Sequence, residues 1–139
     1  MKTVYKINLL LIALILSGCG SSDNNVSDVN SKLVGSWLLT HENQCQETTT
    51  YHSNGTWTNI ALDEIQTGSY TFADNAANDK HSLAMTIEGD NGLADCQGNS
   101  ELSTGLSASV FVSFPSDSIM ELYISENDTS PFFTFTKQP

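Results

Sequence analysis

The sequence predicts an all-β domain, an antiparallel meander of about eight or nine short strands that forms a small barrel or a strongly curved sheet. Apolar and polar residues alternate with a period of two over most of the chain after residue 32. Turn-forming residues interrupt this alternation at short intervals, and helical periodicity is nearly absent. Consecutive strands with short connections usually pair with their neighbours, and closure into a barrel removes exposed edges.

The elements follow from the alternating runs taken in order. Thr48 to Tyr51 is a β-branched and aromatic run, and Asn54-Gly55 behind it favours a tight hairpin turn. We expect strands over 34–41, 47–52, 56–60, 69–73, 82–88, 95–103, 106–114, 120–125 and 132–136, and connections over 63–68, 74–80 and 89–92. The run over 95–103 is weak and polar, so a disulfide through Cys96 is expected to fix its place.

The strongest strand signal is Leu106 to Phe114, which ends at Pro115-Ser116-Asp117. Its apolar residues share one face, and Phe111 lies among serines on the other face. Large apolar side chains outside a core mark ligand or partner sites. Phe111 is therefore a weak candidate for a ligand mouth or a partner patch.

Residues 1–18 have the layout of a secretory signal, with Lys2 and Lys6 before an apolar centre from Leu9 to Leu16. The apolar run is too short for an uncleaved transmembrane anchor, which needs about 20 apolar residues. Leu16-Ser17-Gly18-Cys19 resembles the bacterial lipobox. That resemblance implies cleavage before Cys19, a diacylglycerol on its sulfur and usually a fatty acid such as palmitate on the new amino group.

The lipobox resemblance sets the expected organisation of the chain. It implies a lipoprotein signal peptide over 1–18, the lipidated Cys19 with a flexible tether over 19–32, and a single β-barrel domain over 33–139. The tether is expected because its Ser, Asp and Asn residues offer too little apolar surface to offset the entropy of ordering them. Gly20 rather than Asp after the cysteine suggests an outer-membrane lipoprotein of the cell envelope, with its domain in the periplasm or at the cell surface.

The charge of the chain excludes nucleic acid as a partner. The chain has 16 acidic residues, five lysines and no arginine, and removal of the signal would take away Lys2 and Lys6. Such a balance repels nucleic acid and anionic membrane surfaces. The simplest interpretation of the excess of acidic residues is a solvated acidic surface that keeps an exported protein in solution.

Cys45 and Cys96 remain once Cys19 is assigned to lipid, and we expect them to form a disulfide in the oxidising envelope. The chain-entropy model gives a stabilisation on the order of 4 kcal/mol for a loop of about 50 residues. A redox or metal-binding pair is the alternative, but no Cys-x-x-Cys spacing supports it.

Gly35-Ser36-Trp37 at the start of the first strand, followed by a meander of about eight strands, resembles the lipocalin type of barrel. The resemblance covers about residues 33–139 and implies that Gly35 and Trp37 are structural, with Trp37 packed across the closed end. Lipocalins usually place a late arginine over this tryptophan, and this chain has no arginine and no Thr-Asp-Tyr signature. The alternative of an outer-membrane barrel needs strands of about 9 to 11 residues, longer than most runs here.

Catalytic and metal sites lack a supporting pattern. The three histidines, His41, His52 and His81, lie on separate segments without metal-ligand spacing. Some Asp/Asn/Gly clusters resemble calcium-binding loops in composition, but clusters of this kind between strands usually form turns. No Gly-x-Ser-x-Gly elbow occurs, and Asp63-Glu64 reads as a solvated turn. We therefore expect no enzyme activity, no metal and no cofactor.

The sequence leaves two principal functions open. The first is a membrane-anchored envelope lipoprotein that binds a small hydrophobic ligand in its barrel. The alternative is a structural or interaction lipoprotein with a filled barrel that contacts another envelope protein. The short chain favours a filled or narrowly hollow barrel, and the volume of the interior distinguishes the two functions.

Overall fold

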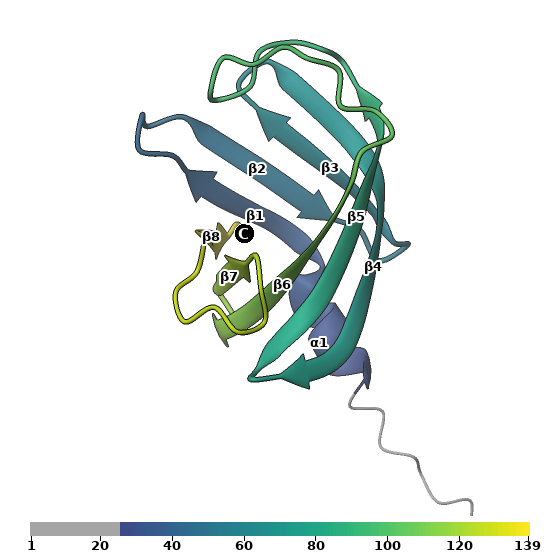
Figure 1. Cartoon of the computed structure of the whole chain (residues 1–139), viewed down its shortest axis with the longest axis vertical. Helices are drawn as coiled ribbons and strands as arrows, with labels where there is room; N and C mark the ends of the chain where they lie inside the picture. The colour runs from purple at the N-terminus through teal and green to yellow at the C-terminus, as the bar shows by residue number, and fades with distance from the viewer. Residues whose placement is uncertain (1–25) are drawn as a thin grey trace, which may run out of the picture.

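A computed structural model describes residues 26–139, with 26–28 and 74–77 described by their backbone only. One short helix precedes eight antiparallel strands that close into a barrel in chain order (Figure 1). The elements are α1 (Val26–Leu33), β1 (Gly35–Thr40), β2 (Gln46–Tyr51), β3 (Thr56–Ala61), β4 (Glu64–Ala77), β5 (Lys80–Asp90), β6 (Ser107–Ser116), β7 (Ile119–Tyr123) and β8 (Phe133–Lys137). The predicted all-β meander is confirmed, and of its two forms the barrel is the one observed.

The barrel closes between its first and last strands, but one part of its wall is short. β1 pairs with β8 through Trp37 with Lys137 and Leu38 with Thr136. The pairing of β6 with β7 begins only at Phe111 with Tyr123. Residues 107–110 of β6 therefore have no strand partner on that side among the described residues, and the wall is open beside them.

The half of the barrel next to α1 contains the fully buried core. Alternate residues of each strand point inward, as the period of two predicts. Five side chains there are completely buried: Leu33, Trp37, Leu83, Val112 and Met120. Each such side chain contributes about 1.5–3 kcal/mol by leaving water, so this half supplies much of the stability.

The flexible tether predicted for 19–32 is wrong from Val26 onward, because Val26–Leu33 forms helix α1. The Leu33 side chain is fully buried in the core, and the Trp37 Nε1–H donates a 2.7 Å hydrogen bond to the Leu33 carbonyl. An isolated helix of eight residues is not stable in water. Docking on the barrel stabilises α1. The polar composition of this segment gives no indication that Leu33 is buried in the core.

Two predicted connections belong to β4. The segment 63–68 is strand from Glu64 onward, and the predicted loop over 74–80 is reduced to the turn at Asn78 and Asp79. Both turn residues have positive φ, 55° and 59°. Asn and Asp tolerate that conformation, which matches the twist of the flanking strands in a two-residue hairpin turn. The polar composition of these segments predicts loops, but polar residues also occur in strands of a small barrel because one face of each strand faces water.

The weak strand predicted over 95–103 is absent, and residues 91–106 form a long irregular loop instead. The Asp95 carboxylate accepts hydrogen bonds from the backbone N–H groups of Gln97 and Asn99. Such local bonds compete with strand pairing. β6 starts after this loop and continues through Pro115 to Ser116, two residues past its predicted end, with an irregular register between Ser113 and Ser116.

Candidate ligand-binding cavity

The half of the barrel away from α1 contains a cavity of about 450 Å³. Its wall is mainly apolar, and these apolar side chains come from seven of the eight strands and the end of the loop before β6. They are Leu39, Tyr51, Trp57, Met85, Ile87, Leu106, Ala108, Leu122, Phe133 and Phe135. The Leu106 side chain is 61% exposed, which places it at the open wall beside the first residues of β6.

Three rows of side chains cross β2, β3 and β4 on the inner face, one above the other. The strand register defines them as Glu47 with Ala61 and Glu64, Thr49 with Asn59 and Gln66, and Tyr51 with Trp57 and Gly68. From the mouth inward, the rows change from carboxylate through amide and hydroxyl to aromatic. The polarity of the wall therefore decreases with depth.

The aromatic row forms a fixed floor. The Trp57 Nε1–H donates a 3.0 Å hydrogen bond to the Ser69 carbonyl, and the Tyr51 ring meets the Tyr70 ring edge to face at 5.3 Å. A Cβ atom at Gly68 would lie 2.8 Å from Trp57 Nε1 and 1.9 Å from the Thr86 carbonyl oxygen. Only glycine fits at this position, and its lack of a side chain leaves room for the Trp57 indole nitrogen beside β4.

The Tyr51 hydroxyl adds a polar group to the floor. Burial raises the pKa of Tyr51 well above its usual value, with smaller contributions from Tyr70 and Glu47. The hydroxyl is therefore protonated at every physiological pH. It donates a 3.6 Å hydrogen bond to the Met85 sulfur, a weak acceptor.

A second, polar cavity of about 510 Å³ adjoins the apolar one at the barrel mouth. Glu47, Asn59 and Gln66 line both cavities, so the two are continuous. The rest of the mouth is lined by Ala61, Glu64, Asp95, Gln97, Asn99, Glu101 and Ser103. Four carboxylates face this space, and no lysine does.

Glu64 is the most buried of these carboxylates, with 7% of its surface exposed. One of its oxygens accepts a 3.0 Å hydrogen bond from the Gln66 amide, which also donates to Asp90. Burial raises the pKa of Glu64, and repulsion from Asp90, Asp95 and Glu47 raises it further. Ionised Glu64 therefore lacks a compensating positive charge.

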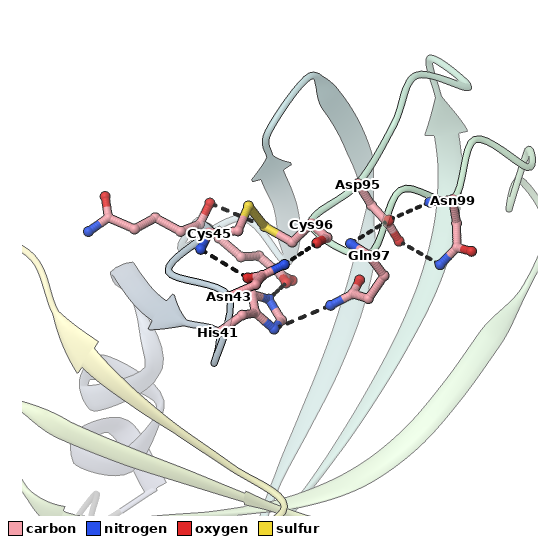
Figure 2. Close-up of a disulfide and its surroundings, with 9 residues drawn as sticks. His41, Asn43, Cys45, Asp95, Cys96, Gln97 and Asn99 are labelled. Atoms are coloured by element: carbon pink, nitrogen blue, oxygen red, sulfur yellow. Dashed lines mark hydrogen bonds and ion pairs between the residues drawn. A yellow bond between two sulfur atoms is a disulfide. The ribbon is translucent and has the colours of Figure 1, made fainter.

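The predicted disulfide is present, and it holds the long loop at the mouth (Figure 2). Cys45, in the connection between β1 and β2, is bonded to Cys96 of the loop 91–106, with a Cα separation of 5.6 Å. Beside it, the Asn43 amide donates a 2.7 Å hydrogen bond to the Cys96 carbonyl. His41 Nε2 lies 2.8 Å from Glu47 Oε2, and the Gln97 amide nitrogen lies 3.3 Å from His41 Nδ1. These contacts fix Gln97 and Glu47 in the wall of the mouth.

The structure brings some of the predicted site residues together and separates others. Trp37 is fully buried beside Gly35 and α1, at the end of the barrel away from the mouth, and it does not line the cavity. Phe111 is half-buried on the face of β6 opposite the inward Val112, and it does not line the cavity either. Cys19 and the signal sequence lie outside the described residues.

Sequence reasoning missed the polar residues of the cavity. The sequence predicts Glu64 in a solvated turn and predicts no role for Asn59 or Gln66, whereas all three line the mouth. A signal was present, because Asn59 alternates in phase with Trp57 and Ala61 and must share their inward face. What could not be inferred was that Glu64 belongs to a strand.

Comparison with protein-family models, with curated proteins and with solved structures gives no match for this chain. Within residues 26–139, no group of three or more His, Cys, Asp and Glu side chains is placed to hold a metal ion. The same part of the chain contains no helix long and apolar enough to cross a membrane.

Proposed function

We propose that this protein is a cell-envelope lipoprotein whose barrel binds a small hydrophobic molecule. The observation that carries the proposal is the apolar cavity of about 450 Å³ in the half of the barrel away from α1. Ligand pockets in proteins typically have volumes of about 300–1,000 Å³, mostly apolar walls and a few polar groups that orient the ligand. The cavity has this size and composition.

The open wall beside β6 supports ligand entry. Residues 107–110 have no strand partner on the side of β7, and Leu106 and Ala108 are exposed there while also lining the cavity. A ligand could enter at this point or through the mouth. A barrel filled by its own side chains would offer neither route.

The membrane anchor rests on Leu16-Ser17-Gly18-Cys19, which resembles a lipobox. Helix α1 lies at the end of the barrel opposite the loop 91–106 (Figure 1). An anchor at Cys19 would therefore hold the α1 end toward the membrane and leave the mouth facing away from it. In cells fed radioactive palmitate, we expect label on the wild-type chain and none on an equally expressed Cys19→Ser variant. An unlabelled wild-type chain would contradict lipidation.

Ligand binding is tested with the chain from residue 19 onward, which contains α1 and all eight strands. The probe is N-phenyl-1-naphthylamine, an uncharged dye whose fluorescence increases in apolar surroundings. We expect saturable binding of one dye per chain. Ala108→Trp, which places an indole in the cavity, should weaken binding at least tenfold, whereas Ser109→Trp on the outer face of the same strand should leave it unchanged. Equal effects of the two variants, or no saturable binding to the wild type, would contradict the proposal.

A second function, contact with another envelope protein, is favoured by exposed leucines at the rim of the mouth. Leu62, Leu93 and Leu102 are 60%, 52% and 71% exposed. A backbone hydrogen bond from Asp63 to Ala94 holds the turn after β3 against the loop 91–106. If the rim binds a partner, Leu102→Ser should abolish a cross-link to one envelope protein without changing dye binding. No such cross-link in the wild type would leave ligand binding as the function.

A further inference from the structure

Carboxylates lie at both ends of the described barrel, but lysines lie at only one. The mouth is lined by Glu47, Glu64, Asp95 and Glu101, whereas the three lysines of residues 26–139 lie toward the α1 end. Lys80 donates hydrogen bonds to the carbonyls of Glu126 and Asp128, and Lys137 donates to the carbonyl of Lys32. None of these ammonium groups lines the mouth or the apolar cavity.

Two buried polar side chains face the cavities with unused hydrogen-bonding atoms. Glu64 and Asn59 are each 7% exposed. Oε1 of Glu64 accepts from Gln66, but its Oε2 accepts from no described residue. Oδ1 of Asn59 accepts from Thr49, but its Nδ2 donates to no residue of the described part. Both atoms open onto the cavity and are not sealed inside the protein, so they are available to a ligand that places a polar end at this depth.

A metal ion does not fit these carboxylates. No group of three or more possible ligands converges in residues 26–139, and Asp95 is already used by the backbone N–H groups of Gln97 and Asn99. Two carboxylates on the outermost row, Glu47 and Glu64, flank the small side chain of Ala61 instead. That spacing leaves room for a cationic group that donates hydrogen bonds.

We propose that the ligand of the cavity is a cationic amphiphile, whose ammonium group binds Glu64 and Glu47 at the mouth and whose apolar part fills the space above Trp57 and Tyr51. This inference rests on the ligand site proposed above. The three inner rows match such a molecule from its charged end to its apolar end. The ammonium supplies the positive charge that ionised Glu64 lacks, and a hydrogen bond between two charged groups is stronger than one between neutral groups.

The carboxylates also act against other amphiphiles. A fatty acid would bring a fifth negative charge to the mouth, and like charges brought together in a partly buried site repel strongly. An alcohol would fill the apolar cavity equally well but would leave Glu64 without a counter-charge. The expected order of affinity is therefore amine, then alcohol, then carboxylate.

The experiment compares three probes with the same ten-carbon chain: decylamine, decan-1-ol and decanoate. Each displaces N-phenyl-1-naphthylamine from the chain starting at residue 19, at pH 7 and low salt. We expect decylamine to bind roughly tenfold or more tightly than decan-1-ol, and decanoate to bind most weakly. Raising the salt concentration should reduce the preference for the amine, because screening weakens charge attraction.

Glu64→Gln is the decisive variant, because it removes the charge and keeps the shape. It should bind the dye and decan-1-ol as the wild type does, and lose most of the preference for decylamine. Glu126→Gln, at an exposed carboxylate remote from the mouth, is the matched control and should keep the preference. Dye binding also shows that each variant is folded, and Glu47→Gln provides an independent second test.

The outcomes separate this inference from the proposed function. If none of the probes displaces the dye, or no dye binds, the ligand site itself is wrong. If decan-1-ol binds and decylamine binds no better, or if decanoate binds best, the ligand site stands and the cationic ligand is wrong. A preference for decylamine that Glu64→Gln and Glu126→Gln reduce equally would indicate non-specific attraction to the acidic surface and would also overturn the inference.

Discussion

The ammonium nitrogen of Lys137 lies 5.0 Å from the centre of the Trp37 ring and donates a 3.0 Å hydrogen bond to the carbonyl of Lys32. One side chain thus joins β8, β1 and the end of α1. A Cβ atom at Gly35 would lie 3.1 Å from the Lys137 side chain, and Gly35 has a φ of 126°, so glycine both permits the turn and leaves room for the lysine.

Lys137→Met should lower the free energy of unfolding by about 1–2 kcal/mol, because it removes the cation from the Trp37 ring and leaves the Lys32 carbonyl without its donor. Urea unfolding followed by tryptophan fluorescence measures the change. Lys32→Met is the matched control. Its ion pair with the exposed Asp117 spans 3.8 Å, and an exposed pair of this kind contributes about 0–1 kcal/mol. Equal losses in the two variants would show that the contact with Trp37 is not stabilising.

Gly68→Ala should prevent stable folding, with a loss of about 3 kcal/mol or more. The added methyl group would overlap the Thr86 carbonyl oxygen at 1.9 Å, and paired backbone cannot move away as a flexible side chain can. Gly98→Ala is the control, because nothing lies within 4 Å of its Cβ position. The cost at Gly98 is limited to its φ of 83°, about 1 kcal/mol. Thermal unfolding compares the two, and a Gly68→Ala protein as stable as the wild type would contradict the close packing of β4 on β5.

Glu64→Gln should stabilise the protein at pH 7. The pKa of Glu64 is raised in the folded state above its ordinary value of 4.5, so folding favours its protonated form and stability falls as pH rises through the raised pKa. Glutamine cannot ionise, so the variant does not lose this stability as the pH rises. The urea midpoint of Glu64→Gln should therefore exceed that of the wild type at pH 7 and approach it below about pH 4, where Glu64 is protonated in both states.

Asp90→Asn should have the opposite effect. Backbone N–H groups of Gly92 and Ser103 donate to the Asp90 carboxylate and lower its pKa below the ordinary 3.8. The ionised carboxylate of Asp90 therefore stabilises the folded state at pH values above its ordinary pKa. This contribution is lost as the pH falls through the lowered pKa. The variant should be less stable than the wild type at pH 7. The same sign of change for Glu64→Gln and Asp90→Asn at pH 7 would contradict these opposed environments.

Replacing Cys45 and Cys96 by serine should lower the free energy of unfolding by about 2–4 kcal/mol, since the bond closes a loop between residues 51 apart in sequence. The loop 91–106 forms no strand, so its amide hydrogens should exchange faster in the variant, while those of β2 and β3 should change less. Hydrogen exchange by mass spectrometry measures both. Unchanged exchange over 91–106 would show that hydrogen bonds such as that from Asn43 to Cys96 hold the loop without the disulfide.

The period-two alternation of apolar residues allowed the fold to be predicted because it is a local property of the chain. Leu83, Met85 and Ile87 had to share one face of a strand wherever that strand lay, and Asn54-Gly55 favoured a hairpin turn wherever it occurred. The pairing of Cys45 with Cys96 followed by elimination once Cys19 was assigned to lipid. For these features the sequence by itself determined the class of fold, the meander and the disulfide.

Tertiary structure alone decided whether the barrel is hollow, where α1 docks and which polar residues face inward. Val26–Leu33 is polar along most of its length, and it joins the domain through the buried Leu33 side chain and through hydrogen bonds from Trp37 and Lys137 to its last carbonyls. Glu64 and Asn59 become cavity residues because the register places Glu64 in one row with Ala61 and Glu47, and Asn59 in the next row with Thr49. Alternation along one strand fixes which side chains share a face, but the volume they leave empty depends on side chains contributed by all eight strands together.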